Sequence, residues 1–160
     1  MGISLQGGKD YLIGVISDTH GHLLPEGMKA FENADLIIHA GDIGKPEILH
    51  ALRGVAPVCA VRGNMDSGRW ARELPETEIV EIGEVLLYVL HDAYGLDLDP
   101  AGAGFSAVIT GHTHKPLIQR RDGVLFLNPG SAGPFRSPAT VALLRLRGNY
   151  LEAELVALTP

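Results

Sequence analysis

The chain has 160 residues, of which 46% are hydrophobic and 20% are charged, and these proportions exclude a disordered chain and fit one globular domain. The 13 Lys and Arg against 19 Asp and Glu give a formal net charge of −6, which argues against general binding to nucleic acid or to an anionic membrane surface. The single cysteine, Cys59, excludes an internal disulfide and a thiolate zinc cluster.

The sequence shows no stretch that is typical of a targeting or membrane segment. A transmembrane helix needs about 20 predominantly apolar residues, and the longest apolar runs, such as Val85–Leu90, are much shorter. Residues 1–10 are polar and Gly-rich and lack the basic and apolar regions of a secretory signal. We therefore expect a cytoplasmic protein without membrane association, with a loosely ordered lead-in over residues 1–10 and a single domain over residues 11–160.

The first half of the chain alternates between predicted strands and predicted helices. Three short runs are apolar and have strand length, and each of the two stretches between them begins with Pro, which suits the first turn of a helix. This order predicts a parallel sheet with crossover helices. The predicted strands are Tyr11–Ser17, Asp35–Ala40 and Pro57–Val61, and the predicted helices are Pro25–Asn33 and Pro46–Arg53.

The second half is predicted to be mostly β-structure. Gly83 and Glu84 separate two apolar runs in the manner of a hairpin, and Gly148 and Asn149 mark another turn. About nine or ten short strands exceed what one open sheet usually holds, so we expect two packed sheets with helices outside. Exposed strands in this half would also allow two copies of the chain to form a homodimer. The predicted strands are Glu78–Ile82, Val85–Leu90, Ala107–Thr110, Val124–Leu127, Thr140–Leu146 and Tyr150–Ala157.

Metal-ligating residue types follow the predicted strands, where an α/β protein places its site. Nitrogen and oxygen ligands without sulfur suit Mn, Fe, Ni, Co or Zn. Seven side chains are more than one tetrahedral ion can use, but they suffice for two ions that share a carboxylate. The seven residues are Asp18, His20, Asp42, Asn64, His91, His112 and His114.

Two metal ions at these residues would favour a phosphate ester as substrate. A pair of ions about 3.5–4 Å apart is a recurring device for hydrolysing such esters, with a metal-bridging hydroxide attacking phosphorus. Two divalent ions and two Asp would leave a local charge of about +2 inside an acidic protein, which suits an anionic ligand. Any one of these motifs alone is weak, because a lone loop His or Asp is more often solvated or a cap. The ordered set at successive strand ends is specific.

The ordered motifs resemble those of the calcineurin-like metallophosphoesterase superfamily. The D-x-H, GD, GN-x-D and G-H-x-H blocks begin at Asp18, Gly41, Gly63 and Gly111, with His91 as the isolated histidine. Residues 128–131 (NPGS) also resemble a loop of the small prokaryotic phosphodiesterase branch. The resemblance covers nearly the whole chain. It implies a four-layer αββα sandwich of two mixed sheets flanked by helices, with a dinuclear metal site at the carboxyl ends of the strands.

The resemblance also implies roles for individual residues. One ion would take Asp18, His20, Asp42 and His114, and the other would take Asp42, Asn64, His91 and His112, so that Asp42 bridges both. Asp42, Asn64 and His112 would also act in catalysis. The implied activity is that of a metal-dependent phosphodiesterase or phosphatase on a small phosphate ester. The cofactor would be two divalent ions, with Mn as the first choice and Ni, Co, Fe or Zn as alternatives.

Two positions depart from the superfamily pattern. Met65 stands where many members have a His that protonates the leaving group, and a thioether cannot transfer a proton. Asp92 follows His91 where Gly is usual, and we expect Asp92 to adopt the left-handed conformation that Asp tolerates better than most residues.

Further residues near the motifs are weighed for binding roles. Arg62 and Arg136 are candidates for gripping a substrate phosphate, and Tyr94 and Phe135 for an apolar wall. His39, inside an apolar run, is interpreted as a core histidine that supports the site.

Two alternatives to an enzyme stay open. The same fold serves as a retromer scaffold that has lost ligand histidines, and a metal-bound phosphate- or nucleotide-binding module would need no proton donor. Retention of every expected ligand favours the enzyme.

Overall fold

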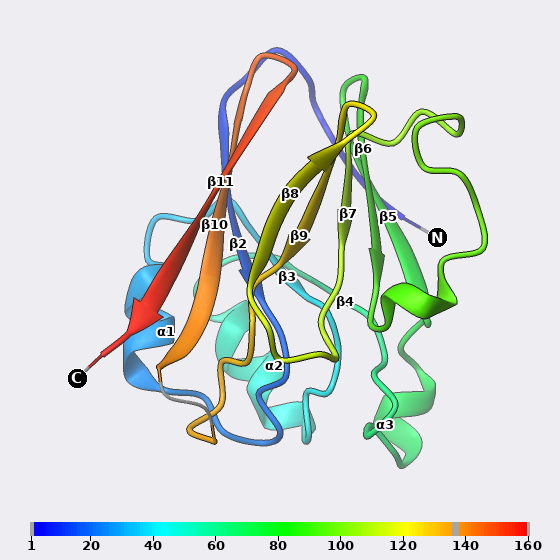
Figure 1. Ribbon diagram of the computed structural model, residues 1–160. Helices are drawn as coiled ribbons and strands as arrows, with labels where there is room; N and C mark the ends of the chain where they lie inside the picture. The colour runs from blue at the N-terminus through cyan, green and yellow to red at the C-terminus, as the bar shows by residue number, and fades with distance from the viewer. Residues whose placement is uncertain (1, 136–137, 160) are drawn as a thin grey trace.

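The computed structural model describes residues 2–135 and 138–159. It contains two mixed β-sheets packed face to face (Figure 1). The first sheet has the order β11-β10-β2-β3-β4, and the second has the order β1-β5-β6-β7-β9-β8.

The first sheet is built around the predicted parallel strands. β2, β3 and β4 run parallel, and β10 and β11 add an antiparallel hairpin along β2. The crossover helices α1 and α2 both begin with Pro at the first helical turn, as predicted. The elements are β2 (Tyr11–Ile16), α1 (Pro25–Ala30), β3 (Leu36–His39), α2 (Pro46–Arg53), β4 (Val58–Ala60), β10 (Ala139–Arg147) and β11 (Tyr150–Leu158).

The second sheet combines antiparallel hairpins with a parallel centre. β6 and β7 are parallel, as are β7 and β9, whereas β5 pairs antiparallel with β6 and β8 with β9. Its elements are β1 (Ile3–Leu5), β5 (Thr77–Ile82), β6 (Val85–Leu90), β7 (Ala107–Ile109), β8 (Leu117–Arg121) and β9 (Val124–Asn128). The short helix α3 (Arg69–Arg72) precedes β5, and the 3-10 helix η1 (Ala93–Gly95) follows β6.

Alternation along the strands divides the apolar side chains among three clusters. Ile13 and Val15 of β2 face Leu87 and Val89 of β6 in the core between the sheets. The opposite face of the first sheet packs against α1 and α2, whose buried side chains include Leu49 and Leu52 (Figure 1). The predicted two-sheet α/β architecture is confirmed.

The outer layer over the second sheet is thinner than the other helical layer. Tyr88 and Val108 point outward from this sheet and are covered by the segment between β6 and β7. That segment contributes Phe105 and the single 3-10 turn η1, with the Tyr88 and Phe105 rings 5.0 Å apart. A loop with one helical turn therefore fills the place of a full helix.

The first residues differ from the expected loose lead-in. Residues Ile3–Leu5 form β1, which pairs in parallel with β5. Gly7 lies so close to Gly83 that an added Cβ would approach the Gly83 Cα to 2.7 Å, and the Tyr11 hydroxyl donates to the Gln6 carbonyl at 2.6 Å. The small residues that suggested disorder thus allow close docking against the β5–β6 hairpin.

Within the described residues, no helix has the length and apolar character needed to cross a bilayer.

Candidate metal centre

The candidate ligands gather where strands of both sheets end. Asp18 and His20 follow β2, Asp42 follows β3 and Asn64 follows β4, all from the first sheet. The second sheet supplies His91 after β6 and, in the loop after β7, His112 and His114. Each of the two groups described below draws on both sheets.

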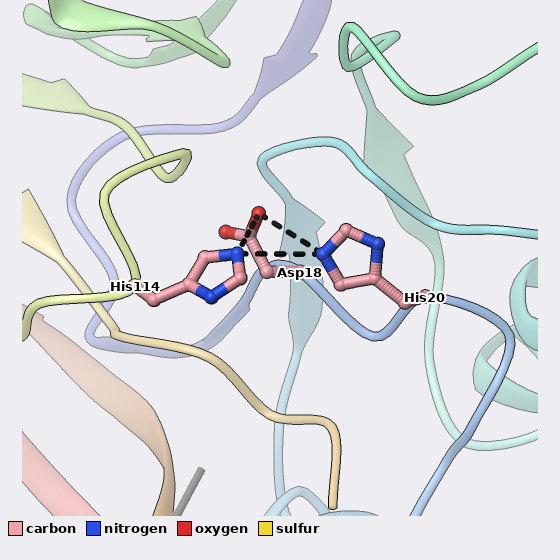
Figure 2. A group of neighbouring side chains, drawn as sticks. All are labelled: Asp18, His20 and His114. Atoms are coloured by element: carbon pink, nitrogen blue, oxygen red, sulfur yellow. Dashed lines mark hydrogen bonds and ion pairs between the residues drawn. The ribbon is translucent and has the colours of Figure 1, made fainter. Parts of the chain in front are cut away.

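The first group consists of Asp18, His20 and His114. Asp18 Oδ1 lies 3.2 Å from His114 Nε2 and 3.8 Å from His20 Nε2, and the two imidazole nitrogens are 3.4 Å apart. Figure 2 shows the two rings on either side of Asp18, with these nitrogens pointing toward each other and toward one carboxylate oxygen. Three potential ligand atoms therefore converge on one point.

The second group consists of Asp42, His91 and His112, with Asn64 beside them. Asp42 Oδ2 lies 3.2 Å from His91 Nε2, and the ligand atoms of the three residues are within 4.8 Å of one another. Asn64 Oδ1 is 3.2 Å from His112 Nδ1. The set offers nitrogen and oxygen ligands only.

Asp42 and Asp18 connect the two groups. Asp42 Oδ2 is 3.8 Å from His20 Nε2, and Asp18 Oδ1 is 3.9 Å from His91 Nε2. The two groups thus form one continuous centre, with Asp42 Oδ2 facing ligand atoms of both.

In each buried candidate ligand residue, one polar side-chain atom is hydrogen-bonded to the protein and the other is directed toward the centre. Asp18 Oδ2 accepts hydrogen bonds from the Ser17 hydroxyl at 2.7 Å and from the His112 N–H at 3.1 Å. Asp42 Oδ1 accepts from the Met65 N–H at 2.9 Å, and His91 Nδ1 contacts the Ala40 carbonyl at 2.7 Å as a donor. These contacts direct Asp18 Oδ1, Asp42 Oδ2 and His91 Nε2 into the centre.

Two of the atoms that face the centre lack aligned hydrogen-bond partners. Asp18 Oδ1 and His91 Nε2 are buried and, within the described residues, make no hydrogen bond, although His114 and Asp42 approach them to 3.2 Å. Buried polar atoms without partners are rare and costly. Short but misaligned contacts are expected of ligands aimed at a common ion, so the residues fit divalent metals.

Backbone strain is concentrated at the same positions. Among the described residues, six non-glycine residues have positive φ, a conformation that is uncommon for them. Five of these are candidate ligands, and such strain persists only where the surrounding structure enforces it. They are Asp18 (56°), His20 (47°), Asp42 (56°), His112 (71°) and His114 (63°).

The charges of the centre shift the pKa values of its ionisable groups. Burial alone would lower the pKa of His91, but the neighbouring Asp42 carboxylate outweighs burial and raises it. Burial alone would raise the pKa of Asp42, but the His91 imidazole and the Met65 N–H outweigh burial and lower it. Without metal, Asp42 and His91 therefore favour an ion pair, and a divalent ion would take the place of the His91 proton.

His39 is a core histidine, as interpreted from the sequence. Its Nδ1 accepts from the Gly41 N–H at 3.1 Å, so its Nε2 carries the proton and donates to the Thr19 hydroxyl at 3.1 Å. Thr19 in turn donates to the Ile43 carbonyl at 2.7 Å. Burial lowers the pKa of His39 to about 3, which keeps the ring neutral. His39 therefore ties the β2 loop to the β3 loop behind the ligands.

The two departures from the superfamily pattern have different structural outcomes. Asp92 does not adopt the expected left-handed conformation: its backbone is extended, with φ −115° and ψ 120°, and its side chain accepts from the Tyr94 N–H. The loop turns through η1, so no positive φ is required there. Met65 is 64% exposed, and its backbone N–H is the group that contacts Asp42 Oδ1.

The candidate substrate residues do not all lie at the centre. Tyr94 is 97% exposed and forms no wall, whereas the Phe135 ring packs edge-on near His20 and His22 at 6.2 and 5.2 Å. Arg62 is engaged by Glu76 at 2.9 Å. Arg136 lies outside the described residues.

A cleft of about 660 Å³ opens beside the second group. Its lining includes Asn64 and His91 from the centre, together with Arg62 and Arg72. Sequence reasoning missed Arg72, whose position in the short segment after the GN-x-D block is the only sequence signal for it.

Two mixed sheets with clustered carboxylates and imidazoles at their strand ends define an α/β protein with a candidate metal centre. The chain belongs to the calcineurin-like phosphoesterase superfamily, whose domain model matches residues 11–149. Members of this family use divalent metals.

Similar proteins include both enzymes and a sorting protein. A probable metallophosphoesterase of Methanocaldococcus jannaschii is 40% identical over 162 residues, covering 93% of this chain and 82% of the relative. A structure described as a novel archaeal phosphodiesterase is 26% identical, with a TM-score of 0.75 over 91% of this chain and 99% of that chain. Vacuolar protein sorting 29 from Cryptosporidium parvum shares the fold, with 21% identity and a TM-score of 0.73 over 94% of this chain and 99% of that chain.

Proposed function

We propose that the protein is a metal-dependent phosphodiesterase that hydrolyses a small phosphate ester. The observation that carries the proposal is the pair of ligand groups that meet at Asp42, in which Asp18 Oδ1 and His91 Nε2 are buried and free of hydrogen bonds. Similarity to a structure described as an archaeal phosphodiesterase supports the reaction class.

We assign the residues to two divalent ions. Asp18, His20 and His114 would hold one ion, Asn64, His91 and His112 would hold the other, and Asp42 Oδ2 would be shared. When bound, the ions would polarise the phosphoryl oxygens and supply a nucleophile from water at neutral pH. Nitrogen and oxygen ligands accept several divalent ions, of which we propose Mn first, with Ni, Co, Fe and Zn as alternatives.

The two residues that follow Asn64 are considered first as proton donors to the leaving group. The Met65 side chain cannot donate a proton, and both oxygens of Asp66 accept backbone N–H bonds, from Gly44 at 3.0 Å and Gly63 at 2.9 Å. Neither residue is therefore placed as a general acid. We assign Asn64 and His112 to holding the phosphoryl group in position, because their side chains meet at the exposed edge of the second group.

A metal-supplemented assay tests the proposal. Metal-free protein is loaded separately with Mn, Ni or Co, and its rates on bis(p-nitrophenyl) phosphate and on p-nitrophenyl phosphate are compared. We expect hydrolysis of the diester with two ions bound per chain. Asp42→Asn should abolish activity on both esters and reduce metal content, because it weakens the ligand shared by both groups.

A scaffold protein would give a different result. Protein that binds two ions but hydrolyses neither ester would contradict the proposal and favour a non-catalytic role, such as the binding of phosphate compounds. A single fully ligated ion in metal-replete protein would contradict the two-ion assignment, and elemental analysis distinguishes the two cases.

A further inference from the structure

We propose that the cleft beside the second ligand group binds an additional anionic group, such as a phosphate, on one ester arm of the substrate. Arg72 is the residue that recognises it. This inference rests on the proposed function, because it assumes that the reacting phosphate sits at the candidate metal centre.

The position of the cleft makes it a continuation of the centre. Asn64 and His91 belong to both, so a phosphoryl group held by the second ligand group borders the cleft. One ester arm of a phosphodiester would then extend along walls formed by residues 66–68, 71–72 and 76–77. The volume of about 660 Å³ is within the range of small-molecule sites and suits an arm the size of a nucleoside or a sugar phosphate.

Most charges in the cleft are already compensated by the protein. Arg62 pairs with Glu76 at 2.9 Å. The Asp66 carboxylate is buried and accepts two backbone N–H bonds. Asp92 accepts from the Tyr94 N–H at 3.0 Å and lies 3.7 Å from His112 Nε2, at the metal end.

Arg72 is the exception among these groups. It is exposed on α3, lines the cleft and makes no ion pair within the part of the chain that the structure describes. A guanidinium binds phosphate or carboxylate oxygens through two parallel N–H bonds, and it keeps its charge at any physiological pH. An uncompensated Arg on a concave wall thus selects an anionic group at a fixed distance from the reacting phosphate.

Two matched substrates and two matched variants test this inference. The substrates are the p-nitrophenyl ester of thymidylate and the same ester with a further phosphate on the remaining sugar hydroxyl. The variants are Arg72→Ala and Arg69→Ala, which remove the same charge from the same short helix, although Arg69 does not line the cleft. Rates are measured with Mn-loaded protein, and equilibrium binding is measured with the corresponding thymidine mono- and bisphosphates.

The wild type should prefer the ester with the additional phosphate by about tenfold in kcat/KM, as expected for a charge-assisted hydrogen bond. Arg72→Ala should lose this preference, and Arg69→Ala should keep it. A wild type without the preference, or a preference that survives in Arg72→Ala, would overturn the inference. If neither ester is hydrolysed, the proposed function fails, and Arg72-dependent binding of the bisphosphate still decides the inference on its own.

Discussion

At the scale of single residues, the two oxygens of Asp18 have different environments. Oδ2 is fixed by the Ser17 hydroxyl and the His112 N–H, whereas Oδ1 is buried and faces the centre without a hydrogen bond. The Ser17 hydroxyl is also 3.3 Å from the Gly41 carbonyl, so it spans the β2 and β3 loops. We infer that Ser17 is a positioning residue that directs Oδ1 toward metal.

Ser17→Ala should weaken the binding of Mn²⁺ by about tenfold, because loss of such supporting contacts typically costs 10–100-fold in metal affinity. Titration calorimetry of metal-free protein measures the change. Ser131→Ala is the matched control, since the Ser131 hydroxyl contacts the Asp18 backbone carbonyl and not its carboxylate. Equal losses of affinity in both variants would show that the Ser17 hydroxyl acts only through the stability of the loop.

Met65→His should speed the hydrolysis of esters with poor leaving groups, within the roughly 10²–10⁴-fold range of general acid catalysis. Met65 is exposed and follows the candidate ligand Asn64, so an imidazole fits there without repacking. Rates on a series of aryl and alkyl phosphodiesters give the dependence on leaving-group pKa, which should be steep in the wild type. If the variant keeps both ions and the slope is unchanged, protonation of the leaving group is not limiting.

At the scale of elements, the loops after β2 and β3 are joined by His39 through Thr19 and Gly41. The buried ring stays neutral because its pKa is lowered to about 3, whereas the same ring in the unfolded chain titrates near 6.5. Between these values the unfolded state binds more protons than the folded state. The His39 contribution to folding stability therefore falls as pH drops from 6.5 toward 3.

His39→Asn should flatten the pH dependence of stability in this range. Asn keeps an acceptor for the Gly41 N–H but does not titrate, so the wild type should lose up to about 1.4 kcal/mol more per pH unit than the variant. Denaturant unfolding of metal-free protein at several pH values between about 4 and 7 measures both slopes. Parallel slopes would show that His39 is not a buried neutral group.

The elements that were predictable from sequence are those with strong patterns. Apolar runs of strand length and Pro at the first helical turn identified β2, β3, β4, α1 and α2. The edge strand β8 was missed because all of its side chains are exposed, and its pairing with β9 depends on backbone hydrogen bonds that leave no alternation in the sequence. β1 was missed because its Gly-rich surroundings suggested disorder, although they permit close packing against the β5–β6 hairpin.

The candidate ligands were easier to find than the cleft. Asp and His are informative when they follow successive strands, because the carboxyl ends of parallel strands meet at one edge of a sheet. Arg72 belongs to a helix of four residues, and its place beside Asn64 and His91 depends on the path of the chain between β4 and β5. Neither spacing nor composition encodes that path.

At the scale of the whole molecule, the two sheets meet through their loops as well as through their apolar faces. Gly111 lies in the loop after β7 of the second sheet, and a Cβ there would approach the hydroxyl of Ser17, which follows β2 of the first sheet, to 2.0 Å. The β2 and β7 loops can therefore come this close only because residue 111 is Gly. This contact allows ligands from different sheets to face one point.

Both ligand groups draw side chains from the two sheets, so each bound ion would act as a cross-link between the halves of the fold. The resistance of the fold to unfolding would then depend on the supply of free metal. Above the dissociation constant, each tenfold rise in free Mn²⁺ should add about 1.4 kcal/mol of stability per ion, and chelation should lower Tm accordingly. A Tm that is indifferent to Mn²⁺ and to chelator would contradict this. Scarcity of metal would then both abolish the proposed hydrolysis and shorten the lifetime of the protein itself.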